Sequence, residues 1–302
     1  MFNDERSWLN RVWTMQETTS NWLLGGLVPE EFMVRKEDLD LPTQFHDGVC
    51  SLLQVLARDP PDLFALAKVL RSRRGTHHID QVSALGLLLK CPALPIYDTK
   101  QRCEDGWGQL VQQMSHKHRT DLLVNCPVVG NAPGTKWCPS WSQLMLGKTI
   151  PSETTVINYS EGELLNCSPI SHDPSVNLGV VYWNYAYVIE SCEFSIEDGR
   201  IHMHVLLGPA SQSQFATDSY KTQPFLVEFS GANPLFDPDF YYAAAGMANL
   251  EYWVLGKISG HGRNMGYVQF EKRSTFRIPC ARERERLWHL NPSYSDTPIR
   301  YL

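Results

Sequence analysis

A carboxylate near the start of the chain, Glu17, is the sharpest candidate for chemistry. It lies four residues after Trp13, which in a helix places it one turn further along the same face. A carboxylate beside an aromatic side chain is partly desolvated, so its charged form is disfavoured unless Arg6 or Arg11 pairs with it. Glu17 could therefore act in catalysis or hold the helix through an ion pair, and we favour the structural role.

Two histidines, His202 and His204, have a spacing that suits a pair of metal ligands. They are two positions apart in a predicted strand, so both imidazoles lie on one face. The sequence offers no third ligand beside them, and a half-exposed face of a hairpin explains them better. No metal site and no cofactor are predicted. Other polar residues near predicted helix ends are interpreted as caps or solvated side chains: His77, His78, Asp80, His116 and His118.

Several motifs that carry chemistry are absent from the sequence. None of the eight cysteines forms a Cys-x-x-Cys pair, so neither a zinc site nor a redox motif is predicted. The glycine-rich segment 259–266 joins two predicted strands and lacks the strand-to-helix context of a phosphate-binding loop. No Gly-x-Ser-x-Gly nucleophile motif is present.

Charge and composition argue against some classes of function. The formal net charge is −6 and the isoelectric point is near 5.9, which argues against a surface that binds nucleic acid. The short basic run 71–74 is interpreted as a solvated helix end. The sequence has no run of about 18 apolar residues and no signal peptide. We therefore expect a cytoplasmic protein without a membrane span, with reduced cysteines.

The residues around Glu17 are predicted to form a helix. The segment 7–17 holds no glycine or proline, and Trp8, Val12 and Met15 form one apolar stripe while Trp13 lies on a second. Large side chains on both stripes predict a central helix, with Trp13 less than fully buried in this chain. Further helices are predicted over 42–57, 62–70, 80–89 and 104–117, with Asp62 and Asp80 as N-caps.

Beyond residue 147 the apolar pattern changes to a period of two. A turn signal, Glu-Asp-Gly at 197–199, predicts that the strands on either side of it pair as a hairpin. The predicted fold is α+β, with a mainly helical domain over 1–147 and a small antiparallel β-rich domain over 148–302. The predicted strands cover 185–190, 201–207, 224–229, 251–258, 265–272 and 274–278, and a charged helix follows over 281–290.

The segment Arg-Val-Trp-Thr-Met-Gln-Glu (11–17) resembles the Arg-x-Trp-Thr-Leu-Gln-Glu block of the fungal heterokaryon incompatibility (HET) domain. Segment 71–88, Trp107 with Leu110, and segment 136–143 with its Pro-Ser-Trp motif follow in the order of that family. Two upstream blocks of the family, Ser-x-x-Trp-Gly and Asp-x-x-Cys-Ile-x-Gln, have no match. The resemblance implies that 1–147 is the second half of a TIR-like α/β domain, with Arg11, Trp13, Gln16, Glu17 and Trp141 as motif residues.

The resemblance implies a function in non-self recognition and programmed cell death, exerted by a binding or signalling module with a protein partner. Two alternatives stay open. The first is an enzyme, a TIR-like NAD glycohydrolase in which Glu17 stabilises an oxocarbenium-like transition state; NAD would then be a substrate. The second is an inactive truncated paralogue. The oligomeric state is not indicated.

Overall fold

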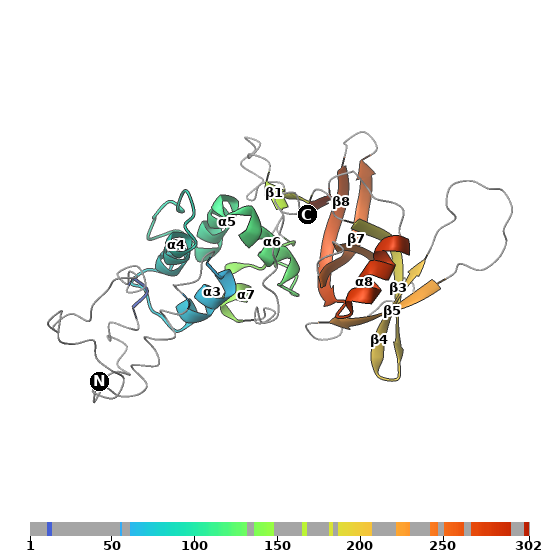
Figure 1. Ribbon diagram of the computed structural model, residues 1–302. Coiled ribbons are helices and arrows are strands. Elements are labelled where there is room, and N and C mark those ends of the chain that lie inside the picture. Colours follow the sequence, from blue (N-terminus) through green and yellow to red (C-terminus); the bar gives the residue numbers. More distant parts are fainter. Residues whose placement is uncertain are drawn as a thin grey trace, which may run out of the picture. The chain divides into compact units, whose positions relative to one another are not determined.

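A computed structural model of the chain is shown in Figure 1. Contacts between residues divide the chain into two compact units, Met1–Met114 and Ser115–Leu302, which are described separately. The fold is mixed α+β. Helices α6 and α7 belong to the second unit. The domain boundary predicted from the sequence at residue 147 is not tested by this division and stays a prediction. The structure describes residues 11–13, 55, 61–131, 136–147, 165–167, 181–183, 187–206, 222–229, 242–246, 251–262, 267–290 and 299–301.

The first unit contains three described helices: α3 (Leu63–Arg71), α4 (Ile79–Leu88) and α5 (Cys103–Gln113). The start of α3 confirms the sequence prediction, because the Asp62 carboxylate accepts the backbone N–H groups of Phe64 and Ala65, at 3.0 Å each. A side-chain oxygen at the N-cap satisfies donors that have no partner within the helix. The apolar faces of α4 and α5 are buried as predicted: Val82, Leu85 and Leu89, and Trp107, Leu110, Val111 and Met114.

Two predictions for the first unit are wrong. Within the predicted helix 7–17 the structure describes residues 11–13, and these form a β-bridge at Arg11 followed by a turn. The long-range pairing of this backbone overrides its local helical pattern. Asp80 is not an N-cap either, because α4 begins after His78 and the Asp80 side chain binds elsewhere. Within the predicted helix 42–57 the structure describes residue 55, which is helical.

The predicted helix 104–117 is two helices. Helix α5 ends at Gln113, and Met114 has extended backbone angles. The Ser115 side chain then caps α6 (His116–Val124), which extends beyond the predicted helix end at residue 117. A short helix, α7 (Trp141–Met145), follows. Its N-cap Ser140 and Gln143 form a reciprocal capping box, with Ser140 N–H bound to Gln143 Oε1 at 2.9 Å.

The second unit contains a nine-stranded sheet in its described part (Figure 1). Strands β8, β5, β4, β3, β6 and β7 are hydrogen-bonded in that order, and β7 also pairs with β8, so these strands form a closed antiparallel ring. Strand β9 joins β8 in parallel. The strands are β1 (Leu165–Cys167), β2 (Val181–Trp183), β3 (Tyr187–Glu197), β4 (Arg200–Leu206), β5 (Thr222–Phe229), β6 (Tyr242–Gly246), β7 (Tyr252–Gly262), β8 (Tyr267–Arg277) and β9 (Ile299–Tyr301).

Several predicted strands are confirmed. The β3–β4 hairpin turns at Asp198 and Gly199, which both have positive φ angles of 50° and 73°. Two positive φ angles in a row are the geometry of the tight hairpin turn that Asp-Gly favours. The two predicted strands 265–272 and 274–278 are one continuous strand, β8. Strand β6 was missed because its sequence, Tyr-Ala-Ala-Ala-Gly, has no alternating pattern.

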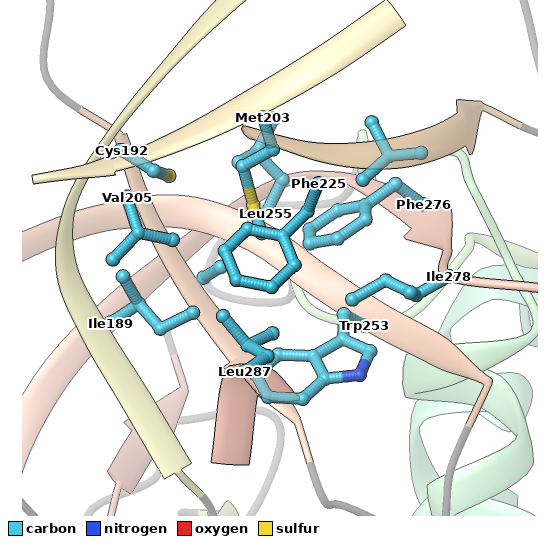
Figure 2. Packing of buried hydrophobic residues seen from close by; sticks show 12 residues of the cluster. Ile189, Cys192, Met203, Val205, Phe225, Trp253, Leu255, Phe276, Ile278 and Leu287 are labelled. Atoms are coloured by element: carbon cyan, nitrogen blue, oxygen red, sulfur yellow. The ribbon is translucent and has the colours of Figure 1, made fainter. Parts of the chain in front are cut away.

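The core of the second unit lies inside the ring of strands (Figure 2). Phe225, Trp253 and Phe276 are at most 1% exposed and come from three different strands. Helix α8 (Ala281–Leu290), predicted correctly from the sequence, contributes Leu287 to this core. Its Arg286 lies over the Phe225 ring, 4.4 Å from the centroid. Among the described residues, no helix is long and apolar enough to cross a membrane.

Candidate functional site

Residues 11–13 and the segment that follows α3 are adjacent in the structure. Arg11 and Arg74 are partners in a parallel β-bridge. The Val12 N–H donates to the Arg74 carbonyl at 3.0 Å, and Arg73 Nη1 donates to the Arg11 carbonyl at 3.2 Å. These contacts join segment 11–13 to the residues that follow α3, across 62 positions of the chain. We call this region the arginine junction: Arg11, Val12, Arg73 and Arg74.

The arginine junction combines one buried and two exposed guanidinium groups. The Arg73 residue is 6% exposed, whereas Arg11 and Arg74 are exposed. Burial lowers the pKa of Arg73 to about 10, so the group is still charged at neutral pH. The interpretation of run 71–74 as a solvated helix end is therefore wrong for Arg73. Gln81 fixes the backbone here, since its side-chain N–H groups donate to the carbonyls of Leu70 and Arg73.

The motif residues of the first block can be placed only in part. Trp13 is half-buried, which agrees with the prediction that this chain does not cover it fully. Val12 is completely buried. The candidate catalytic residue Glu17 and the motif residue Gln16 lie outside the described residues.

Next to the arginine junction, Asp80 organises a loop by binding two donors. Its Oδ1 accepts the Tyr97 hydroxyl at 2.5 Å, and its Oδ2 accepts the His77 backbone N–H at 2.9 Å. Asp80 is fully buried, while His77 and Tyr97 are exposed. A Cβ atom on Gly75 would lie 2.7 Å from Asp80 Oδ2, so the loop closes tightly over the carboxylate. The hydrogen bond to Asp80 raises the pKa of Tyr97.

Replacing Tyr97 by phenylalanine tests whether this carboxylate needs its second donor. The change leaves Asp80 Oδ1 without the hydroxyl, and hydrogen bonds to charged groups contribute about 1.5–3 kcal/mol. Because Tyr97 is half exposed, water can replace part of the bond, and we expect the free energy of unfolding to fall by less than this range. Urea denaturation measures this value. An unchanged midpoint would show that the bond contributes nothing to stability.

The Pro-Ser-Trp motif lies in the second unit, where it begins helix α7. Trp141 is the first residue of α7 and is 5% exposed. Trp137 and, in the first unit, Trp107 are buried as well, so these three indoles are core residues. His118 is also buried, and its Nδ1 lies 3.0 Å from Ser115 Oγ. The interpretation of His118 as a solvated side chain is therefore wrong.

The histidine pair of the β3–β4 hairpin is half-buried, as predicted from the sequence. His204 Nε2 lies 2.7 Å from Ser195 Oγ and 3.7 Å from Glu197 Oε1. The serine and the carboxylate face the same ring nitrogen, and Ser195 also donates to Glu197 at 2.9 Å. A catalytic triad needs them on opposite ring nitrogens. No group of three or more metal-ligating side chains is found in the described part of the chain.

A buried lysine in the second unit was missed by the sequence analysis. Lys272 of β8 is 0% exposed, and its Nζ donates to the carbonyls of Leu123, Cys126 and Trp137. Leu123 lies in the last turn of α6 and Cys126 lies just beyond its C-cap. The end of a helix presents unpaired carbonyl acceptors and the negative end of the helix dipole. The site ties the segment after α6 to the sheet. It is closed to solvent, so its role is structural.

The chain was compared with protein-family models, curated proteins and solved structures. No comparison gave a match.

Proposed function

We propose that the chain is a HET-like protein that acts as a binding and signalling module in fungal non-self recognition and the associated cell death. Segment 1–147 would correspond to the second half of that TIR-like domain, and the protein would act in the cytoplasm through a protein partner. The observation that supports this most is the arginine junction. It brings the block 11–17 and the block 71–88 side by side at Arg11 and Arg74, as expected if both belong to one domain.

Two further observations agree with this proposal. Trp13, a motif residue, keeps part of its indole exposed beside the junction, and partly exposed aromatic residues are common anchors of protein partners. Trp141, the motif residue of the third block, is buried at the start of a capped helix. Trp13 would therefore serve binding, whereas Trp141 would serve the fold.

The test is inducible expression of the chain in a filamentous fungus, with cell viability as the readout. We expect wild-type chain to reduce viability and Trp13→Ala to abolish this effect while the protein stays folded by circular dichroism. Ile196→Ala is the matched control, since Ile196 is also a partly exposed apolar residue but lies on β3, outside all three blocks. Equal loss of activity in both variants, or no effect of the wild-type chain, would speak against the proposal.

The enzyme alternative predicts a different result for Glu17. Incubating the purified chain with NAD and measuring nicotinamide separates a binding module from an NAD glycohydrolase. We expect no nicotinamide release by this chain, and hence no difference between wild type and Glu17→Gln. If Glu17 is a structural ion-pair partner, the same variant lowers the free energy of unfolding by about 1–3 kcal/mol. Nicotinamide release that Glu17→Gln abolishes would favour the enzyme.

A further inference from the structure

The exposed large apolar side chains of the first unit, among its described residues, all come from one stretch of chain. They lie at the end of α4 and in the loop that joins α4 to α5: Leu87 (44% exposed), Leu94 (39%), Ile96 (74%) and Tyr97 (50%). Segment 91–97 contains no charged residue. Exposed apolar side chains that gather in this way mark a contact surface, whereas scattered ones need no explanation. We call Leu94, Ile96 and Tyr97 the loop patch.

Contacts with both neighbouring helices hold the loop patch in place. The Ile96 N–H donates to the side-chain oxygen of Gln109 on α5 at 3.1 Å, and the Tyr97 hydroxyl donates to the buried carboxylate of Asp80 at 2.5 Å. Leu94 packs against α4, where its Cδ2 would lie 2.8 Å from a Cβ atom added to a glycine. Side chains that are already ordered lose little conformational entropy when they enter an interface. The loop patch is therefore suited to a contact with another molecule.

Charges of both signs border the loop patch. Asp98 directly follows Tyr97, Lys100 lies two positions further on, and both are exposed. Asp98 Oδ1 accepts the backbone N–H of Lys100 at 2.9 Å. Among the described residues, neither of these side chains forms an ion pair. Arg102 and Asp105, in contrast, bind each other through two hydrogen bonds. The charges of Asp98 and Lys100 can therefore pair with charges on another molecule.

We propose that the loop patch is the contact surface of a weak homodimer, in which two copies of the chain meet across a twofold axis near Ile96. An apolar centre with a polar rim is the usual anatomy of a protein interface, and tyrosine is enriched there. In a twofold contact the same patch faces itself. Asp98 of one copy then lies opposite Lys100 of the other, and the reverse, so the charges of the rim attract each other.

The dimer is weak because three apolar side chains make a small interface, and small interfaces belong to transient complexes. We expect a dissociation constant on the order of micromolar. The dimer rests on the contacts and charges of the loop alone, and it does not depend on whether the chain is a HET-like module.

The experiment is analytical ultracentrifugation of the full chain over a range of concentrations, where we expect a reversible equilibrium of monomer and dimer. Ile96→Asp puts a charge at the centre of the loop patch and should raise the dissociation constant at least about tenfold. Ile196→Asp is the matched control, because Ile196 is 62% exposed on β3 of the second unit. Its dissociation constant should equal that of the wild type. A chain that is monomeric at every concentration, as expected if the patch binds a different protein, would overturn the proposal. A dimer that Ile96→Asp leaves unchanged would do the same.

Charge reversal tests whether the two copies meet through the same surface. Asp98→Lys leaves two positive charges at the rim, and Lys100→Asp leaves two negative ones. Each variant alone brings like charges together at both symmetry-related positions and should dimerise about tenfold more weakly than the wild type. An equimolar mixture of the two variants brings opposite charges together and should recover the dimer. Circular dichroism verifies that each variant is folded. A mixture that dimerises no better than the separate variants would contradict the twofold contact.

Discussion

Replacing Lys272 by methionine is expected to lower the free energy of unfolding by about 3 kcal/mol. The Lys272 ammonium donates to the carbonyls of Leu123 at 2.8 Å, Cys126 at 2.6 Å and Trp137 at 3.2 Å. An ammonium has three N–H groups, so every donor is used. Methionine has a similar length but no donor, and it would lose all three bonds in the interior, where no water replaces them.

Urea denaturation measures this loss, and Lys257→Met is the matched control. Lys257 lies on the neighbouring strand β7 but is exposed, so its substitution should change stability by less than about 0.5 kcal/mol. A similar, small effect of both substitutions would show that the buried lysine does not hold the segment after α6 to the sheet.

The same lysine predicts a dependence of stability on pH. Burial lowers the pKa of Lys272 from 10.5 to about 8, although Cys126 and Cys138 act in the opposite direction. Between these two pH values the unfolded chain keeps the proton and the folded chain has lost it. The unfolded state then binds more protons, so this group makes stability rise with pH, by at most about 3 kcal/mol. The difference in stability between wild type and Lys272→Met should therefore widen from pH 8 to pH 10. A difference that narrows would contradict this pKa.

Replacing Trp253 by alanine is expected to cost about 3–5 kcal/mol, as for other large aromatic residues in cores. Trp253 is 1% exposed and stacks on Phe276, with ring centroids 6.5 Å apart. Figure 2 shows its indole below the Phe225 ring and beside Leu287 of α8, in the cluster formed by several strands. A Cβ atom on Gly246 would collide with this indole, so the ring packs closely against the backbone of β6. Removing it leaves a cavity that the closed ring of strands cannot collapse to fill.

Trp253→Phe is the informative companion to this variant, measured by the same urea denaturation. The Trp253 Nε1 is buried without a hydrogen-bond partner in the described part of the chain, so phenylalanine removes an unsatisfied donor and keeps an aromatic ring. We expect a loss of less than half that of the alanine variant. Equal losses would show that the indole fills space that no smaller ring can fill.

The amino-acid sequence by itself determined the elements whose signals lie within a few residues. Asp62 is followed by an apolar helical pattern, and it caps α3. The Asp198–Gly199 turn joins β3 to β4 because both residues tolerate positive φ angles. The bounds 281–290 of the last helix are also those of the structure. Each of these outcomes depends on propensities and hydrogen bonds along one stretch of backbone.

Contacts between distant residues decided the rest. Segment 7–17 has a helical pattern, yet Arg11 forms a β-bridge with Arg74. The Val12 N–H next to it donates to the Arg74 carbonyl, which belongs to a distant part of the chain. Asp80 precedes a helical pattern as a cap would, but Tyr97 and the His77 backbone engage it instead. In both cases a tertiary hydrogen bond outweighs a local preference, which amounts to only a fraction of a kcal/mol per residue.

The interior of the second unit shows most clearly which features a sequence pattern does not predict. The alternating pattern of β8 identifies a strand but gives no reason for a lysine to be buried in it. The carbonyls that accept Lys272 are 135–149 positions away. Likewise, the pairing of β7 with both β6 and β8 closes the ring of strands, although each strand alone indicates only that it has an apolar face. A sequence pattern reports which side of an element avoids water, whereas the partner that covers this side is chosen only when the whole chain packs.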